Sequence, residues 1–258
     1  MNIVRIFYMK IALIPMSAKP YHLGHHKLIQ YAEKTNDAVM VFVSYSGRGI
    51  KKIKDPNDSR SIKEGAAKIE LPKKGEIPIF GDDMKYIWEE ILLDELEFSD
   101  KVRLLTPSHG AHPSPIRNIH EVCEILLNQG VISVPFLDLE LHSSEVSLSI
   151  YSDSNDILDN YDKANMIKMY GDLINQQIFL VGVDRCSTID ISGTQMRKFL
   201  KNGQIRNFEQ FLPPIEKKSK NIVTKILLDS ISSGSSFYCR EQQKNIIDSY
   251  EIIPIMSG

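Results

Sequence analysis

The stretch "IALIPMSAKPYHLGHHKLIQYA", Ile11–Ala32, places a strand, a turn and the start of a helix in direct succession. Ile11–Pro15 is a continuous apolar run, which is typical of a parallel strand covered on both faces. After a turn, Leu23–Lys34 shows helical periodicity, and His22 and His25 stand at its beginning, three residues apart. A strand that leads directly into a helix is the basic unit of an α/β fold.

The rest of the chain repeats this alternation of apolar runs and helical periodicity. The further predicted strands are Val39–Tyr45, Val102–Leu105, Val131–Val134, Ile178–Val183 and, as an alternating edge strand, Val146–Ile150. The further predicted helices are Ser61–Glu70, Asp82–Glu97, Pro115–Asn128, Asn155–Leu173 and Gly193–Asn202. This order predicts a doubly wound α/β fold with a mainly parallel sheet, in which ligands bind at the carboxyl ends of the strands.

Composition narrows the class of protein. The 258 residues include 31 Lys and Arg against 33 Asp and Glu, a net charge of −2, so we expect neither a nucleic-acid nor a membrane partner. Cys123, Cys186 and Cys239 are far apart and form no CxxC pair, which argues against a disulfide framework and a structural zinc site. We therefore expect a cytoplasmic protein. Met1–Tyr8 is too short for a signal peptide and is assigned no role.

His22 and His25 fall where a helix begins after the first strand. Unpaired backbone N–H groups and the helix dipole favour an anion there, and a spacing of three residues puts both imidazoles on one helix face. Gly24 between them leaves space for a base or phosphate, and Pro20 restricts the path of the chain. A binding role and an ordinary structural role both remain open for two histidines taken alone.

A second stretch, "VDRCSTIDISGTQMRKFLKNGQ" (Val183–Gln204), follows the last predicted strand. Ser192 with Gln195 forms a capping-box pattern that predicts another helix start. The first N–H groups of that helix, the Thr194 hydroxyl and the Arg197 guanidinium are suited to phosphate oxygens. By itself the pattern also fits a capped surface helix with an incidental arginine.

Taken together, HxGH after the first strand and ISGTxxR after the last resemble the HxGH/ISSTxxR nucleotidyltransferase superfamily, which is cytidylyltransferase-like. The resemblance covers most of Ile11–Pro214. It implies a Rossmann-like fold and attack of a substrate phosphate on the α-phosphorus of a nucleoside triphosphate, with release of pyrophosphate and no covalent enzyme intermediate.

The same resemblance implies roles for individual residues. His22 and His25 would stabilise the transferring phosphoryl group, and Thr194 and Arg197, with Ser192, would hold the β and γ phosphates. The residues expected at the nucleotide are Ser17, Lys19, Gly24, Asp184, Ser192 and Gly193. Magnesium would arrive with the triphosphate, so no metal-binding residues are expected.

The sequence also departs from the family pattern. Met16–Pro20 stands where family members commonly have Gly-x-Phe-x-Pro, and Gly193 replaces the second serine of ISSTxxR. The glycine variant resembles nicotinamide mononucleotide adenylyltransferases and sulfurylases. "SPIRNIHEV" (Ser114–Val122) and "FEQFLPP" (Phe208–Pro214) are similar to cytidylyltransferase-like proteins of bacteriophages.

For several other residues the sequence allows either a binding role or a structural role. Arg48 begins a basic run with Lys51, Lys52 and Lys54 that we interpret as a solvated loop made mobile by Gly47 and Gly49, with Arg48 as a candidate substrate contact. Arg117 is a candidate contact for the phosphate of the acceptor, and Asp184 is either a nucleotide contact or a turn residue. His109 and His112 lack a third metal ligand and are expected in a loop, and Trp88 is expected in the core.

The predicted domains are a catalytic domain over residues 9–214 and a C-terminal helical extension with a tail over residues 215–258. The predicted reaction transfers AMP from ATP to a phosphorylated small molecule such as nicotinamide mononucleotide. A CTP-dependent cytidylyltransferase and a non-catalytic nucleotide sensor remain alternatives, and a homo-oligomer is left open. A class I aminoacyl-tRNA synthetase fragment is disfavoured, because ISGTQMR lacks the central lysine of that family's second signature.

Overall fold

The computed structural model describes residues 9–129, 131–134, 139–142, 145–154, 169–170, 177–184 and 189–242. The chain divides into two compact units, of which unit 1 comprises Met1–Ser44 and Glu97–Ser192. Unit 2 comprises Tyr45–Leu96 and Gly193–Gly258. The boundary predicted between residues 214 and 215 stays a prediction.

Unit 1 is built on a five-stranded sheet. Its strands are β1 (Met9–Met16), β2 (Ala38–Val43), β5 (Val102–Leu105), β8 (Val146–Asp153) and β9 (Ile178–Val183). They lie in the order β5-β2-β1-β8-β9, and every neighbouring pair is parallel. The chain thus runs outward from β1 through β2 to β5 and continues on the other side of β1 with β8 and β9, so the switch point lies between β1 and β8.

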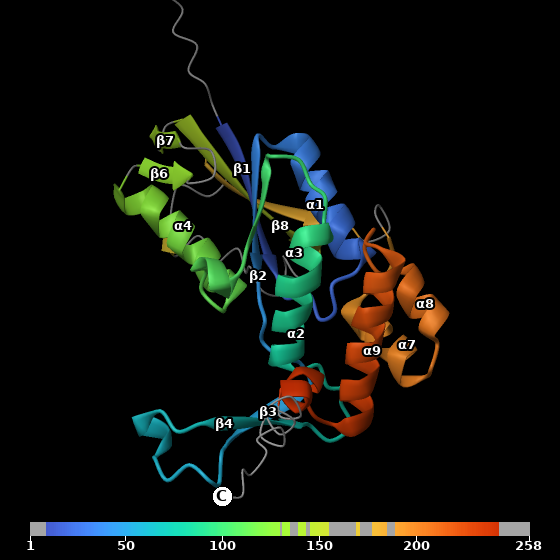
Figure 1. Cartoon of the computed structure of the whole chain (residues 1–258). Helices are drawn as coiled ribbons and strands as arrows, with labels where there is room; N and C mark the ends of the chain where they lie inside the picture. Colours follow the sequence, from blue (N-terminus) through green and yellow to red (C-terminus); the bar gives the residue numbers. More distant parts are fainter. Residues whose placement is uncertain are drawn as a thin grey trace, which may run out of the picture. The chain divides into compact units, whose positions relative to one another are not determined.

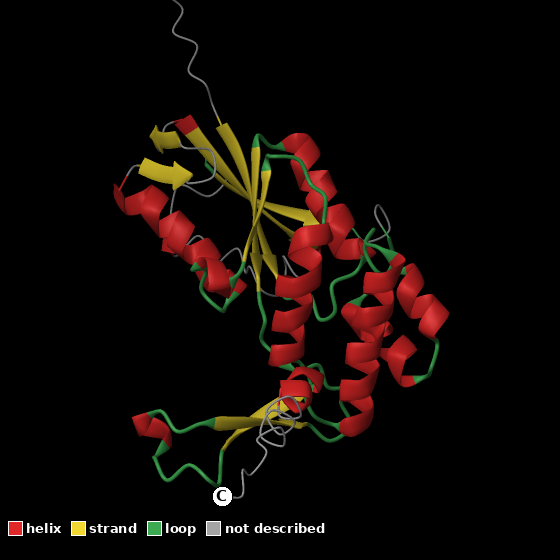
Figure 2. Cartoon of the chain, in the orientation of Figure 1, coloured by secondary structure: helices red, strands yellow, loops and turns green. Residues whose placement is uncertain are grey.

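Among the described residues of unit 1, helices cover both faces of the sheet. Helix α1 (Leu23–Thr35) lies on one face and helix α4 (Pro115–Gln129) on the other, and both contact β1 (Figures 1 and 2). This arrangement confirms the predicted Rossmann-like α/β fold and the two helices predicted at these places.

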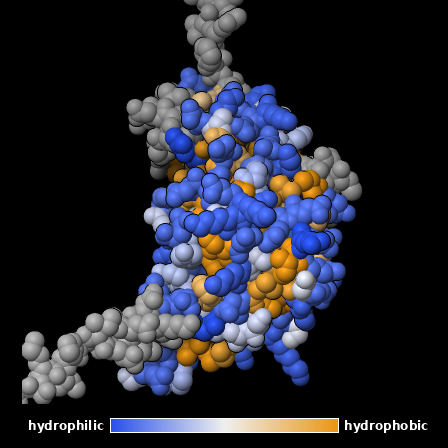
Figure 3. Space-filling view, turned by 45° about the vertical axis from the view of Figure 1, so that its right-hand side comes forward, coloured by the Kyte–Doolittle hydropathy of each residue, from blue (hydrophilic) through white to orange (hydrophobic). Residues whose placement is uncertain are grey.

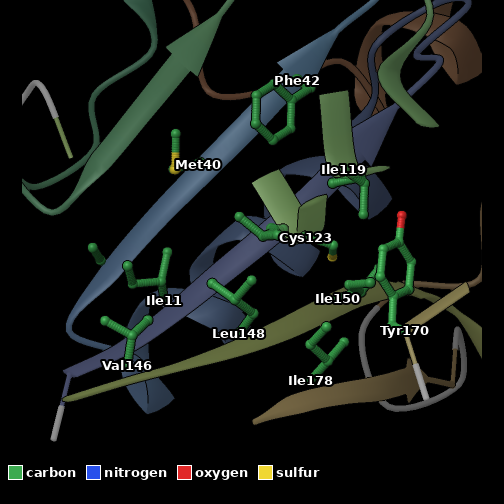
Figure 4. Packing of buried hydrophobic residues seen from close by; sticks show 12 residues of the cluster. Ile11, Met40, Phe42, Ile119, Cys123, Val146, Leu148, Ile150, Tyr170 and Ile178 are labelled. Atoms are coloured by element: carbon green, nitrogen blue, oxygen red, sulfur yellow. The ribbon is translucent and has the colours of Figure 1, made fainter. Parts of the chain in front are cut away.

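The hydrophobic core under α4 uses alternate residues of neighbouring strands. Ile11 of β1 stands beside Ala38 of β2 and Leu148 of β8, so the three side chains share one face of the sheet. The buried cluster comprises Ile11, Leu13, Ala38, Met40, Phe42, Ile119, Cys123, Val146, Leu148, Ile150, Tyr170 and Ile178 (Figure 4). Burial also raises the pKa of the Cys123 thiol to about 12, so this cysteine behaves as a small apolar side chain.

Two strand predictions in unit 1 need correction. The alternating run Val146–Ile150 predicts an edge strand, but β8 lies between β1 and β9. Its Ser147 is small enough to be buried there along with the apolar residues. Val131–Val134 forms strand β6, which pairs antiparallel with β7 (Leu139–His142) in a separate two-stranded sheet rather than in the central one. Of the predicted helix Asn155–Leu173, only residues 169 and 170 are described, and the rest of this prediction lies outside the described residues.

Unit 2 contains a β-hairpin and several helices. The hairpin consists of β3 (Ile50–Lys54) and β4 (Lys68–Pro72). Helical turns α2 (Gly81–Ile87), η2 (Trp88–Leu92) and α3 (Leu93–Glu95) follow one another, as predicted for this region, and Trp88 is fully buried. Helices α7 (Gly193–Lys201), α8 (Ile205–Gln210) and α9 (Lys217–Ser233) contact one another, and α9 also contacts α2.

The helix predicted for Ser61–Glu70 is wrong. Only the single turn η1 (Ile62–Glu64) forms, and it ends at Gly65, whose φ of 79° lies in the left-handed region. Residues 68–70 of the predicted helix instead belong to strand β4, which pairs with β3.

A buried carboxylate joins α2 to the end of α9. Asp83 is fully buried, and it accepts hydrogen bonds from the Ser230 hydroxyl at 2.5 Å and the Ser236 hydroxyl at 2.8 Å. It also accepts one from the Tyr238 N–H at 3.0 Å. The serine-rich stretch at the end of α9 therefore folds onto α2, where it supplies hydrogen bonds that the buried carboxyl group would otherwise lack.

Hydrophilic residues cover most of the face shown in Figure 3, with smaller hydrophobic patches between them. In the part of the chain that the structure describes, we find no helix with the length and hydropathy required to span a membrane.

Candidate functional site

His22, the first of the two predicted histidines, is the N-cap residue of helix α1, which begins at Leu23. His22 has an extended backbone, with φ −147° and ψ 170°, and its N–H donates to Nδ1 of His25 at 3.3 Å. Side chain and backbone of these two residues cap each other in the manner of a capping box. The histidines therefore help to start the helix as well as presenting imidazoles at its N-terminus.

The two imidazoles lie in a stack of three rings. The ring centroids of His22 and His25 are 3.8 Å apart with an interplanar angle of 28°. The His25 ring also stacks with the ring of Tyr21, with centroids 5.6 Å apart and an angle of 11°. His22 and Tyr21 are buried, whereas His25 is partly exposed. Stacking thus fixes the plane of the His25 ring while leaving part of it accessible.

A third histidine supports this stack, and sequence reasoning did not single it out. His26 is 2% exposed, its ring packs against Phe98, and its Nδ1 lies 3.3 Å from the Tyr21 hydroxyl. Burial, reinforced by the charge of Lys27, lowers the pKa of His26 from 6.5 to about 4, so the ring is neutral near pH 7. The signal in the sequence was its position on the same helix face as Ile29, three residues on, which is the face that α1 buries.

Gly24 lies directly against the first histidine. A Cβ at this position would stand 3.0 Å from both Cε1 and Nδ1 of the His22 ring and 3.3 Å from Cγ2 of Ile191. The His22 ring itself therefore requires a glycine here, and a role of Gly24 at the nucleotide stays a prediction. The same contact brings Ile191, the first residue of ISGTxxR, beside the HxGH motif.

Ser17 and Lys19 lie between the end of β1 and the start of α1. Ser17 is exposed, whereas Lys19 is only 8% exposed and precedes Pro20 through a cis peptide bond. Both positions follow the carboxyl end of the central strand, next to the switch point of the sheet, where the fold places ligands.

Asp184 follows the carboxyl end of β9. Its Oδ1 accepts a hydrogen bond of 2.6 Å from the hydroxyl of Ser154, which follows the end of β8. A Cβ at Gly182 would lie 3.1 Å from Cα of Ser154, so this glycine permits the two strand ends to approach. The structure places Asp184 at the edge of the sheet expected from the sequence and adds Ser154, which the sequence analysis missed.

The start of α7 is more polar than the start of α1. Thr194 is exposed, Arg197 is half-buried, and the Arg197 guanidinium donates to the Thr194 hydroxyl at 3.0 Å. Burial lowers the pKa of Arg197, the positive charge of Arg48 lowers it further, and the charge of Glu76 opposes these effects. Arg48 and Arg197 are far apart in the sequence and were both predicted to bind the substrate or nucleotide. In unit 2 they are close enough for the charge of Arg48 to act on Arg197.

Arg48 is exposed, but its backbone forms a β-bridge with Ile79 instead of the predicted open loop. It exchanges two backbone hydrogen bonds of 2.8 Å with Ile79. A Cβ on Gly47 would be 2.7 Å from the Ile79 carbonyl oxygen, and one on Gly49, with φ 65°, would be 2.7 Å from the Ile77 carbonyl oxygen. These glycines permit close backbone packing instead of mobility, and the lysines that follow belong to strand β3 and its hairpin.

The remaining candidates lie on α4 and in the loop before it. Arg117 is exposed on the first turn of α4, and its Nε is 3.6 Å from Glu121 one turn further on. His109 ends a short 3₁₀ helix, η3 (Pro107–His109), and lies 3.1 Å from the Thr106 hydroxyl, whereas His112 lies in the predicted loop and accepts from the N–H of Ser114. Among the residues that the structure describes, no three His, Cys, Asp or Glu side chains are grouped closely enough to hold a metal ion.

Comparison with known proteins yields similarity of structure only. No family model and no curated protein matches the sequence. A protein of Vibrio parahaemolyticus described as a nicotinate-nucleotide adenylyltransferase is similar in structure over 85% of this chain and 99% of its own, with 12% identity and a TM-score of 0.46.

Two structures of a bifunctional nicotinamide mononucleotide adenylyltransferase/ADP-ribose pyrophosphatase from Francisella tularensis are also similar. One, in complex with AMP and a manganese ion, matches over 88% of this chain with 14% identity and a TM-score of 0.43. The other matches over 97% with 14% identity and a TM-score of 0.45. The chain spans 52% and 57% of these two proteins. Similarity at this level carries no conclusion about activity, and the fold assignment rests on the observed strand order.

Proposed function

We propose that this chain is a nucleotidyltransferase that transfers AMP from ATP to a phosphorylated small molecule, such as nicotinamide mononucleotide, and releases pyrophosphate. The observation that carries the proposal is the stacked pair His22 and His25 at the N-terminus of α1, directly after the central strand β1. A helix N-terminus at the switch point of a parallel sheet is where such folds bind phosphate groups.

In the proposed reaction, an oxygen of the acceptor phosphate forms a bond to the α-phosphorus of ATP. The bond from that phosphorus to the bridging oxygen breaks, and the electron pair leaves with pyrophosphate. Negative charge on the transferring phosphoryl group is then stabilised by N–H groups of His22 and His25, whose rings are held by stacking and capping. Preorganised donors of this kind, together with alignment of the reactants, are sufficient for the transfer.

The second motif would bind the leaving group. Arg197 and Thr194, hydrogen-bonded to one another, would contact the β and γ phosphates, with Ser192 and Gly193 contributing at the start of α7. The positive charge of Arg48, which lowers the pKa of Arg197, supports this role, because an anion bound at Arg197 offsets the repulsion between the two cations. Magnesium would enter bound to the triphosphate. It would reduce the negative charge of the triphosphate, which otherwise repels the phosphate of the incoming acceptor.

The roles of the remaining residues are proposed by position. Ser17, Lys19 and Asp184 follow strand ends of the central sheet and would contact the nucleotide, with Asp184 suited to a ribose hydroxyl. Arg117, exposed on α4, would contact the acceptor phosphate after leaving Glu121.

The proposal is tested by following pyrophosphate release with ATP or CTP, magnesium and a panel of phosphorylated acceptors. We expect ATP to raise the unfolding temperature and to support release only when an acceptor is present. A strict preference for CTP would instead indicate a cytidylyltransferase. Binding of nucleotides without release of pyrophosphate with any acceptor of the panel would contradict the enzymatic proposal and favour a sensor.

A further inference from the structure

The start of α1 holds the His25 ring by one of its two nitrogens. The His22 N–H donates to Nδ1 of His25 at 3.3 Å. Because a backbone N–H can only donate, Nδ1 is an acceptor and carries no hydrogen in this bond. A neutral imidazole has one N–H hydrogen, which must then be on Nε2. The helix cap therefore selects the tautomer in which Nε2 is the donor nitrogen of His25.

Tyr21 limits the rotation of that ring. Its own ring is 2% exposed and lies nearly parallel to the ring of His25, with an interplanar angle of 11° and centroids 5.6 Å apart. The last side-chain torsion of histidine has broad minima, so it does not by itself fix the plane of a partly exposed ring. A neighbouring aromatic ring that stays parallel does fix the plane, and rotation away from it would also move Nδ1 away from the His22 N–H.

Tyr21 is itself held in place by His26. Tyr21 precedes the N-cap residue and His26 is the fourth residue of α1, two positions whose side chains commonly pack together at a helix start. The two rings meet edge to face at an angle of 81°, and the Tyr21 hydroxyl lies 3.3 Å from Nδ1 of His26. Burial raises the pKa of Tyr21 well above its usual value, so the hydroxyl keeps its hydrogen for this contact.

We propose that Tyr21 is a positioning residue for the transfer reaction, because its ring keeps His25 on the helix cap and so makes Nε2–H the donor to the phosphoryl oxygen. The inference rests on the proposed function for the ligand, whereas the tautomer is a property of the free protein. During the transfer, Nε2–H donates to a non-bridging oxygen of the α-phosphate and keeps its hydrogen, while the phosphorus exchanges pyrophosphate for the acceptor oxygen. A donor that needs no rotation before the reaction stabilises the developing charge best.

The contact is tested first without ligand, on the full-length chain. Long-range nitrogen–proton spectra at about pH 8, where neutral imidazole dominates, report the tautomer of His25. Hydrogen exchange of the His22 amide reports its bond to Nδ1. We expect the wild-type protein to show the hydrogen on Nε2 and a protected amide. In Y21L the protection should fall about tenfold, because the His25 ring turns off the cap, whereas Y21F retains the ring and should behave as the wild type.

The matched control is Y170L, which removes a second buried tyrosine from a histidine. Tyr170 is 2% exposed, and its ring centroid lies 5.8 Å from that of His120 at an interplanar angle of 24°, in the cluster under α4. This variant should lose stability as Y21L does, but its His22 amide should stay protected relative to the other amides of α1. Comparison of the two variants therefore separates loss of the ring contact from general destabilisation.

Pyrophosphate release then measures the effect on the reaction. Y21L should lower kcat about tenfold and change KM for ATP by less than about twofold, because a misplaced donor is missed mainly in the transition state. Y21F should restore kcat to within about twofold of wild type, and Y170L should leave kcat per folded molecule unchanged.

A wild-type His25 with its hydrogen on Nδ1 would overturn the proposal, and it would do so even if Y21L failed to fold. Equal protection of the His22 amide in Y21L and wild type, or equal losses of kcat in Y21L and Y170L, would also overturn it. The expected tautomer and exchange without pyrophosphate release from any acceptor would contradict the proposed function and leave the role of Tyr21 at the cap in place.

Discussion

The helix starts of α1 and α7 are built from different kinds of contact. At α1, buried rings stack on each other, and the two histidines also cap the helix. At α7, an exposed threonine and a half-buried arginine are joined by one hydrogen bond. Substitutions at α1 should therefore affect folding and activity together, whereas substitutions at α7 should mainly affect binding of the ligand.

The largest effect is expected for His25→Ala. If His25 stabilises charge that develops during transfer, turnover should fall by roughly 10²–10³, as on removal of one preorganised donor. Loss of the acceptor for the His22 N–H should also cost about 1 kcal/mol of stability. Pyrophosphate release per folded molecule measures the first effect, and urea unfolding the second.

The matched control is Lys27→Ala on the exposed side of the same helix, which should leave both quantities unchanged. Turnover of His25→Ala close to that of wild type would remove His25 from the reaction.

The next effect concerns acid stability through His26. Its pKa is about 4 in the folded protein and 6.5 when unperturbed, so between these values the unfolded chain binds more protons than the folded one. The stability that the neutral ring contributes is therefore complete above pH 6.5 and is lost as the pH falls towards 4. After allowance for screening by solvent, the loss should be about 2 kcal/mol.

Urea unfolding at several pH values checks this, with His26→Gln as the comparison. The wild-type protein should lose more stability than the variant between pH 6.5 and 4. Parallel curves for the two proteins would mean that His26 does not titrate with a lowered pKa.

A smaller effect is expected for Gly24→Ala. The new methyl group would meet the buried His22 ring at 3.0 Å and force it to move. Because alanine favours a helix by about 1 kcal/mol over glycine, overall stability should change little, while turnover should fall about tenfold. Nuclear magnetic resonance of the histidine rings would show the shift of His22, and an unchanged His22 signal with full activity would contradict the prediction.

The smallest and most selective effect is expected for Arg197→Lys. Lysine cannot reproduce the planar fork of the guanidinium, so affinity for ATP should fall up to about tenfold, with a smaller loss for ADP and none for AMP. Stability should stay within about 0.5 kcal/mol of wild type. Calorimetry with the three nucleotides measures the series. Equal losses for all three, or none, would mean that Arg197 does not bind the terminal phosphates.

Element prediction worked best where a single physical pattern dominated. The strands around Ile11, Val39 and Val102 are continuous apolar runs in a sheet with both faces covered, and each was confirmed. Prediction was wrong for Ser61–Glu70, where pairing with β3 outweighed local helical periodicity. For β8, alternation indicated an edge strand, but small serines such as Ser147 are buried at little steric cost.

The sequence by itself determined the strands β1, β2 and β5 and the places where α1 and α7 begin, because apolar periodicity and capping act over a few residues. Only the tertiary structure decided that Tyr21 and His26 support His25, that Ile191 packs at Gly24, and that Arg48 lies near Arg197. These contacts join residues whose side-chain positions depend on burial and on the packing of several elements at once. No local pattern carries that information, since the same histidine or arginine fits a solvated surface equally well until its neighbours are known.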